Sequence, residues 1–355
     1  MRLKSMLLYA VSAAFVLCLA GCGAEAPLVI DKQGQPTDPP SIALAEETVR
    51  ALRARDATLR VGSIIKVPSM LGDRSGDQPG SDLILVQDFL LSTLGSMGAR
   101  CVFVDRDGQP VIEGLFIMCE LFSEGRAAAT PETLPDGTPN TRFLTGYIDV
   151  AGEFVIPPRF RFAADFREGL ALVMENSTFG FIDLAGDLVI PCQYAQASDF
   201  GEGLAAVAED ADDGRRWRYI DPTGATALEL PETVVHADVF SDGLAAVTVT
   251  DPARPERAAK TGYIGKSGAF VIEPQFESAG AFVDGLAPAK RKGRWGYIDK
   301  QGEFAIEPQY LDAVPFEGDV AFVHVRKRVW PWQSDSWREC MYWLDWMHTD
   351  RIDIL

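Results

Sequence analysis

The chain has 355 residues, 47% of them hydrophobic, and a formal net charge of −18. This apolar content is enough for a buried core, which excludes a disordered chain, and the length allows one large domain or two to three ordinary ones. The acidic balance excludes nucleic acid as a partner and argues against attachment to anionic lipid through a basic patch, because phosphate groups repel negative charge.

The first residues predict a targeting signal. Arg2 and Lys4 form a short basic region, and residues 6–20 form an apolar run that is short for a membrane span. Small residues follow where a signal peptidase would cleave. We therefore expect residues 1–21 to be a signal peptide.

The end of this signal carries a more specific pattern. Leu19-Ala20-Gly21-Cys22 resembles the lipobox of bacterial lipoproteins. The resemblance implies cleavage before Cys22, a diacylglycerol on its thiol and, because Gly23 rather than Asp follows, sorting to the outer membrane. An ordinary signal peptide that happens to carry a cysteine is the alternative. The expected location is the bacterial cell envelope, with the N-terminal lipid as the membrane contact.

The next segments predict a tether and a small mixed domain. Residues 22–40 are rich in Pro, Gly and Asp, which is typical of a flexible linker. Residues 41–100 predict a helix and then a β–α–β pattern: a helix at 41–59, strands at 59–67 and 100–104, a polar loop at 68–80 and an amphipathic helix at 81–96. This order is loosely similar to that of curli-secretion-type outer-membrane lipoproteins, which implies a component of a secretion or surface-assembly apparatus.

A short pattern then recurs six times. Each copy has an aromatic residue, a Gly five residues later and, in five copies, an Asp two residues later. Asp and Gly at this spacing predict a tight turn that closes on a left-handed Gly, and the apolar flanks predict a hairpin. The copies begin at Phe103, Tyr147, Phe181, Tyr219, Tyr263 and Tyr297.

A second turn follows in most copies. The pattern Phe-x-Glu/Asp-Gly predicts this turn, which leads into a strand such as Leu204–Val207. Each unit is therefore expected to be three short antiparallel strands that cannot bury their apolar face alone. Residues 101–328 are predicted to form a mainly β array of about six such meander repeats, either propeller-like or an open superhelix.

The repeats resemble those of the bacterial WG-repeat (KWG) proteins. The best copy reads Arg294-Trp295-Gly296-Tyr297-Ile298-Asp299, and Trp217 holds the Trp position in the fourth copy. The resemblance implies an all-β repeat fold and no particular chemistry, because the family is not tied to one activity. Other residues replace Trp in the remaining copies: Cys101, Thr145, Phe179 and Thr261.

Residues 329–355 are rich in tryptophan. One interpretation is an aromatic platform for a partner, a glycan or the membrane interface, and the other, which we favour, is a C-terminal cap over the end of the array. For Trp217 and Trp295 we likewise favour core residues over exposed binding aromatics. The tail tryptophans are Trp330, Trp332, Trp337, Trp343 and Trp346.

Four cysteines remain beyond Cys22: Cys101, Cys119, Cys192 and Cys340. Outside the cytoplasm they could form two disulfides, and Cys101 with Cys119 is the shortest closure. Buried free thiols are the equal alternative.

No catalytic or metal-binding pattern stands in a supporting context: Ser63-Ile64-Ile65-Lys66 matches the S-x-x-K of serine enzymes, but it lies in a predicted strand, whereas the nucleophile of those enzymes opens a helix. The three histidines are unclustered, and neither H-E-x-x-H nor G-x-S-x-G occurs. The Asp of each turn is expected to cap its own backbone rather than to bind calcium. We therefore expect no enzyme, no cofactor and no metal, but a non-enzymatic binding or scaffolding module with an envelope protein or glycan as partner. The secretion apparatus is the alternative.

Overall fold

The computed structural model of the chain describes residues 28–36, 64–66, 83–91, 97–105, 110–114, 116–211, 214–251, 253–254, 258–316 and 319–325. Within these ranges every regular element is a β-strand, and the strands form seven antiparallel sheets. The same ranges contain no helix with the length and apolar character needed to cross a membrane.

We number the sheets as blades one to seven. Blade one is β2 (Ile64–Lys66), β3 (Ile84–Leu91), β4 (Met97–Val104) and β5 (Pro110–Gly114); blade two is β6 (Phe116–Cys119), β7 (Ala127–Pro131), β8 (Thr145–Ile148) and β9 (Phe154–Phe160); blade three is β10 (Phe162–Ala163), β11 (Leu170–Glu175), β12 (Thr178–Asp183) and β13 (Leu188–Tyr194).

The remaining blades continue in chain order. Blade four is β14 (Gln196–Ala197), β15 (Ala205–Ala211), β16 (Gly214–Ile220) and β17 (Thr226–Glu229); blade five is β18 (Val234–Ala237), β19 (Leu244–Val249), β20 (Lys260–Gly265) and β21 (Phe270–Phe276); blade six is β22 (Ser278–Ala279), β23 (Ala287–Arg291), β24 (Arg294–Ile298) and β25 (Phe304–Tyr310); blade seven is β26 (Asp312–Ala313), β27 (Val320–His324) and β1 (Leu28–Asp31).

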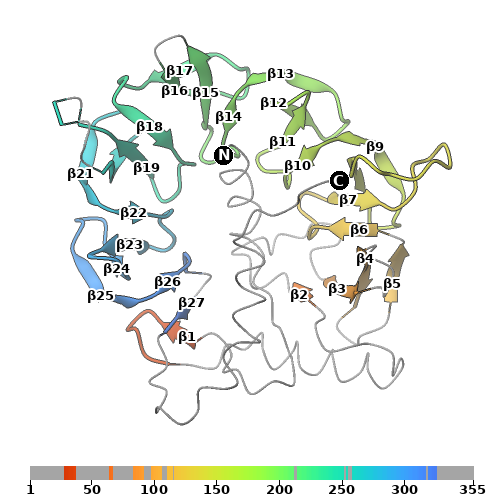
Figure 1. Cartoon of the computed structure of the whole chain (residues 1–355), viewed down its shortest axis with the longest axis horizontal. Helices are drawn as coiled ribbons and strands as arrows, with labels where there is room; N and C mark the ends of the chain where they lie inside the picture. Colours follow the sequence, from red (N-terminus) through yellow and green to blue (C-terminus); the bar gives the residue numbers. More distant parts are fainter. Residues whose placement is uncertain are drawn as a thin grey trace, which may run out of the picture.

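The blades lie around a common centre in chain order, with the first strand of each blade innermost and the fourth outermost (Figure 1). The fold is therefore propeller-like, and the mainly β repeat architecture predicted from the sequence is confirmed. Each complete blade has four strands where the pattern predicts three. The additional innermost strand, such as the two-residue β10, is too short to show an alternating pattern.

Antiparallel pairing gives every blade two distinct ends. In blades two to six, the connections from the first strand to the second and from the third strand to the fourth lie at one end, which we call the turn end. The connections from the second strand to the third lie at the other end, which we call the loop end, and some of them are as short as residues 176–177. The longest of these loops follows β7 in blade two.

The core lies between the blades rather than within them. Buried side chains of the described residues form six clusters, and each cluster draws on two consecutive blades. Between blades five and six, for example, Tyr263 and Ile272 pack with Phe282 and Ala289. A single blade has no core of its own, which is the physical reason for the repetition.

The repeated aromatic residue joins each blade to the next. Its ring packs on a Phe that lies between the first and second strands of the following blade, with ring centroids 4.7 to 5.0 Å apart. Such pairs add roughly 0.5–1.5 kcal/mol beyond the burial of their area. The pairs are Phe103–Phe122, Tyr147–Phe166, Phe181–Phe200, Tyr219–Phe240, Tyr263–Phe282 and Tyr297–Phe316.

Where the aromatic residue is tyrosine, its hydroxyl makes a second link. It donates a hydrogen bond to a backbone carbonyl of the next blade, as Tyr263 does to Gly280 at 2.8 Å. Burial raises the pKa of these phenols above the usual value of 10.0. The other three bonds, 2.6 to 2.8 Å long, join Tyr147 to Ala164, Tyr219 to Asp238 and Tyr297 to Val314.

The Gly that follows the Trp position is required by the outermost strand, which crosses directly over it. A Cβ at Gly262 would lie 2.6 Å from the carbonyl oxygen of Ile272. The register between β20 and β21 shifts here, so β21 bulges over the glycine. In blade four Arg218 takes this position, and β17 has only four residues where β21 has seven.

Blade seven joins the beginning of the described chain to its end. β1 pairs antiparallel with β27, which places Leu28 opposite Val323 and Asp31 opposite Val320. The predicted tether is therefore wrong for residues 28–36, which complete a blade. The sequence does carry the signal, because residues 30–34 read Ile-Asp-Lys-Gln-Gly, as residues 298–302 do.

The predicted β–α–β segment is not formed in the described residues. Residues 84–91, inside the range predicted as a helix, form β3, which pairs with both β2 and β4. A short apolar run fits either periodicity, and pairing with β4 decides between them. The strand predicted at 100–104 is confirmed as part of β4. The similarity to curli-secretion lipoproteins thereby loses its structural basis, and the helix predicted at 41–59 lies outside the described residues.

We expect Gly262→Ala to lower the free energy of unfolding by about 1–3 kcal/mol, because the new methyl group would meet the backbone of β21. Denaturant unfolding measures this. The matched control is Gly265→Ala in the same strand, where the Cβ would meet only the Val271 side chain at 3.5 Å. Equal, small effects at both positions would contradict the requirement for glycine at residue 262.

We expect the buried tyrosines to make the fold sensitive to alkali. Their pKa is raised in the folded state, so the folded chain holds these protons more tightly than the unfolded chain. This contribution is fully present below about pH 10, the unfolded value, and is lost as the pH rises further. Tyrosinate absorbance of the four interface tyrosines should appear only together with unfolding. Their titration near pH 10 in a still-folded protein would contradict the assignment.

Candidate binding face

The turn that follows each inter-blade Phe has an uncommon backbone. Arg167 and Leu170 exchange both backbone hydrogen bonds, which leaves Glu168 and Gly169 as the two central residues of the turn. Both have positive φ, 55° and 79°. Glycine adopts this conformation freely, whereas glutamate there costs free energy. The same positive φ recurs at the acid of each turn that the structure describes: Glu124, Glu168, Glu202, Asp242 and Asp284.

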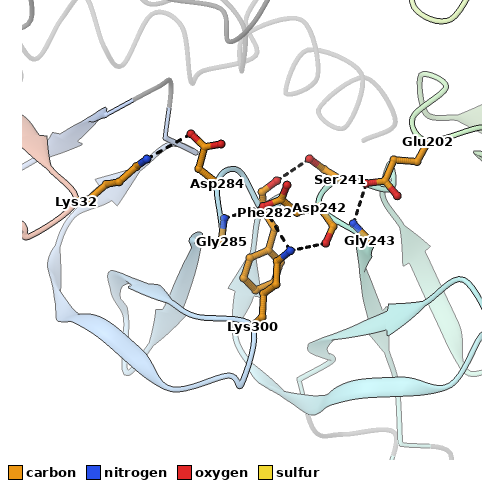
Figure 2. A network of polar contacts seen from close by, with 9 residues as sticks. All are labelled: Lys32, Glu202, Ser241, Asp242, Gly243, Phe282, Asp284, Gly285 and Lys300. Atoms are coloured by element: carbon orange, nitrogen blue, oxygen red, sulfur yellow. Dashed lines mark hydrogen bonds and ion pairs between the residues drawn. The ribbon is translucent and has the colours of Figure 1, made fainter.

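This conformation directs each acid toward the next blade. Its carboxylate accepts a hydrogen bond from the backbone N–H of the Gly in the following turn, as Asp242 does from Gly285 at 2.7 Å (Figure 2). The bond is charge-assisted and explains why the strained residue is acidic. The equivalent bonds, 2.8 to 3.0 Å long, join Glu124 to Gly169, Glu168 to Gly203 and Glu202 to Gly243.

A lysine reinforces this contact in three consecutive interfaces. Lys300, in the outer turn of blade six, donates to the carbonyl oxygen of Asp242 at 2.8 Å, with its Nζ 3.7 Å from the carboxylate. Lys266 lies 3.1 Å from the Glu202 carboxylate, and Lys32 lies 3.4 Å from that of Asp284. Figure 2 shows the contacts of Lys32 with Asp284 and of Lys300 with Asp242. The acidic turns on this side are neutralised by the chain itself.

Blades three and four have no lysine at this position of the turn end. Leu184 and Pro222 occupy the equivalent position in blades three and four. Among the described residues, the carboxylates of Glu124 and Glu168 keep the glycine bond but form no ion pair. Leu184 is 37% exposed, so this part of the face combines acidic and apolar groups.

The two arginines of these turns make other contacts. Arg126 donates to the carbonyl oxygen of Gly125 at 3.1 Å. Arg167 lies 3.7 Å from the Asp199 carboxylate. Val150, at the position of the lysine in blade two, is 38% exposed. We call this surface, defined by Glu124, Val150, Glu168 and Leu184, the uncompensated face.

The two tryptophans of the repeats differ in how deeply they are buried. Trp217 is 4% exposed, packs in the cluster between blades four and five, and makes an edge contact with His236 at 5.3 Å. Trp295 is half-buried beside the cluster between blades six and seven, with Lys290 Nζ 5.9 Å from its ring centre. The favoured reading of a core residue therefore fits Trp217 better than Trp295.

Neither cysteine of the candidate disulfide is bonded in the structure. Cys101 and Cys119 are buried in the cluster between blades one and two and are not joined by a disulfide. Cys22, Trp330, Trp332 and Trp337 lie outside the described residues. In the part of the chain that is described, His, Cys, Asp and Glu form no group that could hold a metal ion.

The sequence indicated the acidic turns but not their contacts. Phe-x-Glu/Asp-Gly predicts a turn, whereas the bond from the acid to the next blade joins residues 35 to 45 positions apart. One signal was available: an acid recurs where a turn needs only positive φ, for which Gly or Asn would serve. A second was the lysine three residues after the aromatic in two successive copies, Lys266 after Tyr263 and Lys300 after Tyr297.

We expect Trp217→Ala to cost about 3–5 kcal/mol of unfolding free energy, because it empties a buried site between two blades. Trp295→Ala, which removes a half-buried ring, should cost less. Denaturant unfolding of both variants checks the order. A larger loss for Trp295→Ala would contradict the placement of Trp217 in the core.

Comparison with solved structures returns matches at low sequence identity. A eukaryotic initiation factor structure matches with a TM-score of 0.46 and 12% identity, over 67% of this chain and 66% of that one. The β-propeller domain of the Trilobed protease from Pyrococcus furiosus, described as having an open velcro topology, matches with a TM-score of 0.45 and 10% identity, over 70% and 90%. An acylaminoacyl peptidase from Pyrococcus horikoshii matches at 0.43 and 10%, over 66% and 46%.

Among curated proteins no sequence matches the chain. A model of the WG-containing repeat matches four segments, residues 146–178, 179–211, 262–295 and 295–326. These segments include the third strands of blades two, three, five and six, where Gly lies beneath the outermost strand. The segment around Trp217, where Arg218 replaces that Gly, is not matched. The chain is a WG-repeat protein.

Proposed function

We propose that the protein is a non-catalytic binding module of the bacterial envelope, held to the membrane by a lipid on Cys22. The propeller-like β-repeat fold supports the non-catalytic part of this proposal, because its repeated polar groups serve to join blades. The observation that carries the proposal is the uncompensated face. Glu124 and Glu168 on this face have no lysine partner among the residues that the structure describes. The equivalent acids in the other blades are neutralised by Lys32, Lys266 and Lys300.

The partner that fits this face is a protein segment with basic and apolar side chains. A lysine or arginine of the partner would take the position that the chain's own lysines occupy in the other interfaces. Apolar side chains would cover Val150 and Leu184, which are 38% and 37% exposed. Desolvation of these groups on docking would strengthen the ion pairs, which are weak when exposed to water.

No observation favours a secretion or surface-assembly apparatus over this proposal. The β–α–β segment on which that alternative depends is replaced by the strands of blade one. If the partner is a component of a secretion apparatus, the crosslinking experiment below would still identify it.

The test is photo-crosslinking in the native envelope with a photoreactive amino acid at residue 184. The matched control carries it at residue 189, which is 42% exposed on the outermost strand of blade three. We expect a defined adduct from 184 and none from 189. Adducts of the same pattern from both positions would overturn the assignment of the binding face.

Charge variants then test the recognition itself. Glu124→Gln with Glu168→Gln keeps an acceptor for each glycine N–H and removes both charges, so recovery should fall about tenfold, roughly 1.4 kcal/mol. Glu202→Gln removes a charge that Lys266 already neutralises and should leave recovery unchanged. Equal losses in both variants would contradict recognition through the uncompensated face.

A further inference from the structure

Both limits of the described chain lie at the same end of blade seven. β27 starts beside Asp319, whose carboxylate is 3.2 Å from Lys32 at the turn end, and runs to the loop end. β1 runs in the opposite direction, so Leu28, opposite Val323, is also at the loop end. The chain therefore enters β1 from the loop end, and Val325 continues from it.

The position of Cys22 limits its distance from this end. Leu28 is six positions after Cys22, and an extended chain spans at most about 3.5 Å per residue, or roughly 20 Å. To reach the level of the turn end, the chain would have to fold back along β1, which has four residues and is about 13 Å long. A lipid on Cys22 would thus bring the loop end toward the bilayer and leave the turn end facing away.

The loop end carries an aromatic residue that is held exposed. The loop after β7 is fixed by Asn140, which is 4% exposed and bonds the carbonyls of Pro131 and Leu144 and the N–H of Leu144. This anchor leaves Phe143 58% exposed, with a positive φ of 54°. A bulky residue in that conformation is strained, and the buried asparagine fixes the loop that holds it.

We propose that the loop end is the membrane-facing surface of the protein and that Phe143, with the exposed Arg142 beside it, contacts the lipid headgroup region. The inference rests on the proposed lipid anchor. An aromatic ring next to a basic side chain is suited to the boundary between headgroups and acyl chains. The five inter-blade acids lie at the opposite end, away from anionic headgroups.

The orientation has a consequence for the binding face. The uncompensated face is at the turn end, so it points away from the membrane and stays accessible to a soluble or peptidoglycan-side partner. Lipid and partner would then occupy opposite ends of the blades without competing for the same surface.

The test places a fluorescent amino acid at residue 143 or at residue 184 of the full-length lipidated protein. Each protein is reconstituted in phosphatidylethanolamine–phosphatidylglycerol vesicles with a quencher on a fraction of the headgroups. We expect loss of fluorescence at 143 and no loss at 184. Three other outcomes, in protein that floats with the vesicles, would overturn the orientation: loss of fluorescence at 184 alone, at both positions, or at neither.

Flotation distinguishes a failure of the proposed orientation from a failure of the proposed lipid anchor. Protein that carries no lipid and does not float with the vesicles overturns the anchor, and the orientation with it. The Phe143→Ser variant with the fluorophore at residue 142 provides a second measurement of quenching. Quenching at 142 that depends on Phe143 supports a direct contact, whereas quenching that does not change shows that the ring makes no contact with the headgroups.

Discussion

An aromatic ring that packs across the boundary between two blades is the contact on which the rest of the structure depends. A blade of four short strands has two apolar faces and no interior. The pair formed by Tyr263 and Phe282, repeated from Phe103–Phe122 to Tyr297–Phe316, gives each boundary a centre around which aliphatic side chains are buried. Because every pair joins consecutive copies, the order of blades in space follows their order in the chain.

The residues around this pair differ in how much variation they tolerate. The Trp position accepts other side chains when its cross-strand neighbour changes with it: Thr261 bonds Thr248 at 3.0 Å, and Thr145 bonds Thr130 at 2.8 Å. The Gly beside it has no such freedom, because the obstacle is backbone. This difference explains why the repeat is degenerate at Trp and why loss of Gly at residue 218 coincides with a shortened outermost strand.

The two ends of the blades have different chemistry. The turn end is built from strained acidic residues that bind the next blade, and its charge is neutralised on one side by three lysines and left free on the other. Among the described residues the loop end shows no such series, and its connections vary from blade to blade in length. A repeat array can in this way keep its internal contacts and still present two distinct surfaces.

The sequence by itself determined the repeats, the hairpin turns and the mainly β class. A turn such as Asp299–Gly302 is set by dihedral preferences and by a hydrogen bond that the backbone N–H of Gln301 donates to the Asp299 carboxylate, all within a few residues. Only the tertiary structure decided that residues 84–91 are a strand and that Leu28–Asp31 belongs to the last blade. It also decided that Trp217 is buried and which acids meet a lysine. Each of these depends on partners far apart in the chain, up to the 252 positions between Lys32 and Asp284, and local propensity does not encode such contacts.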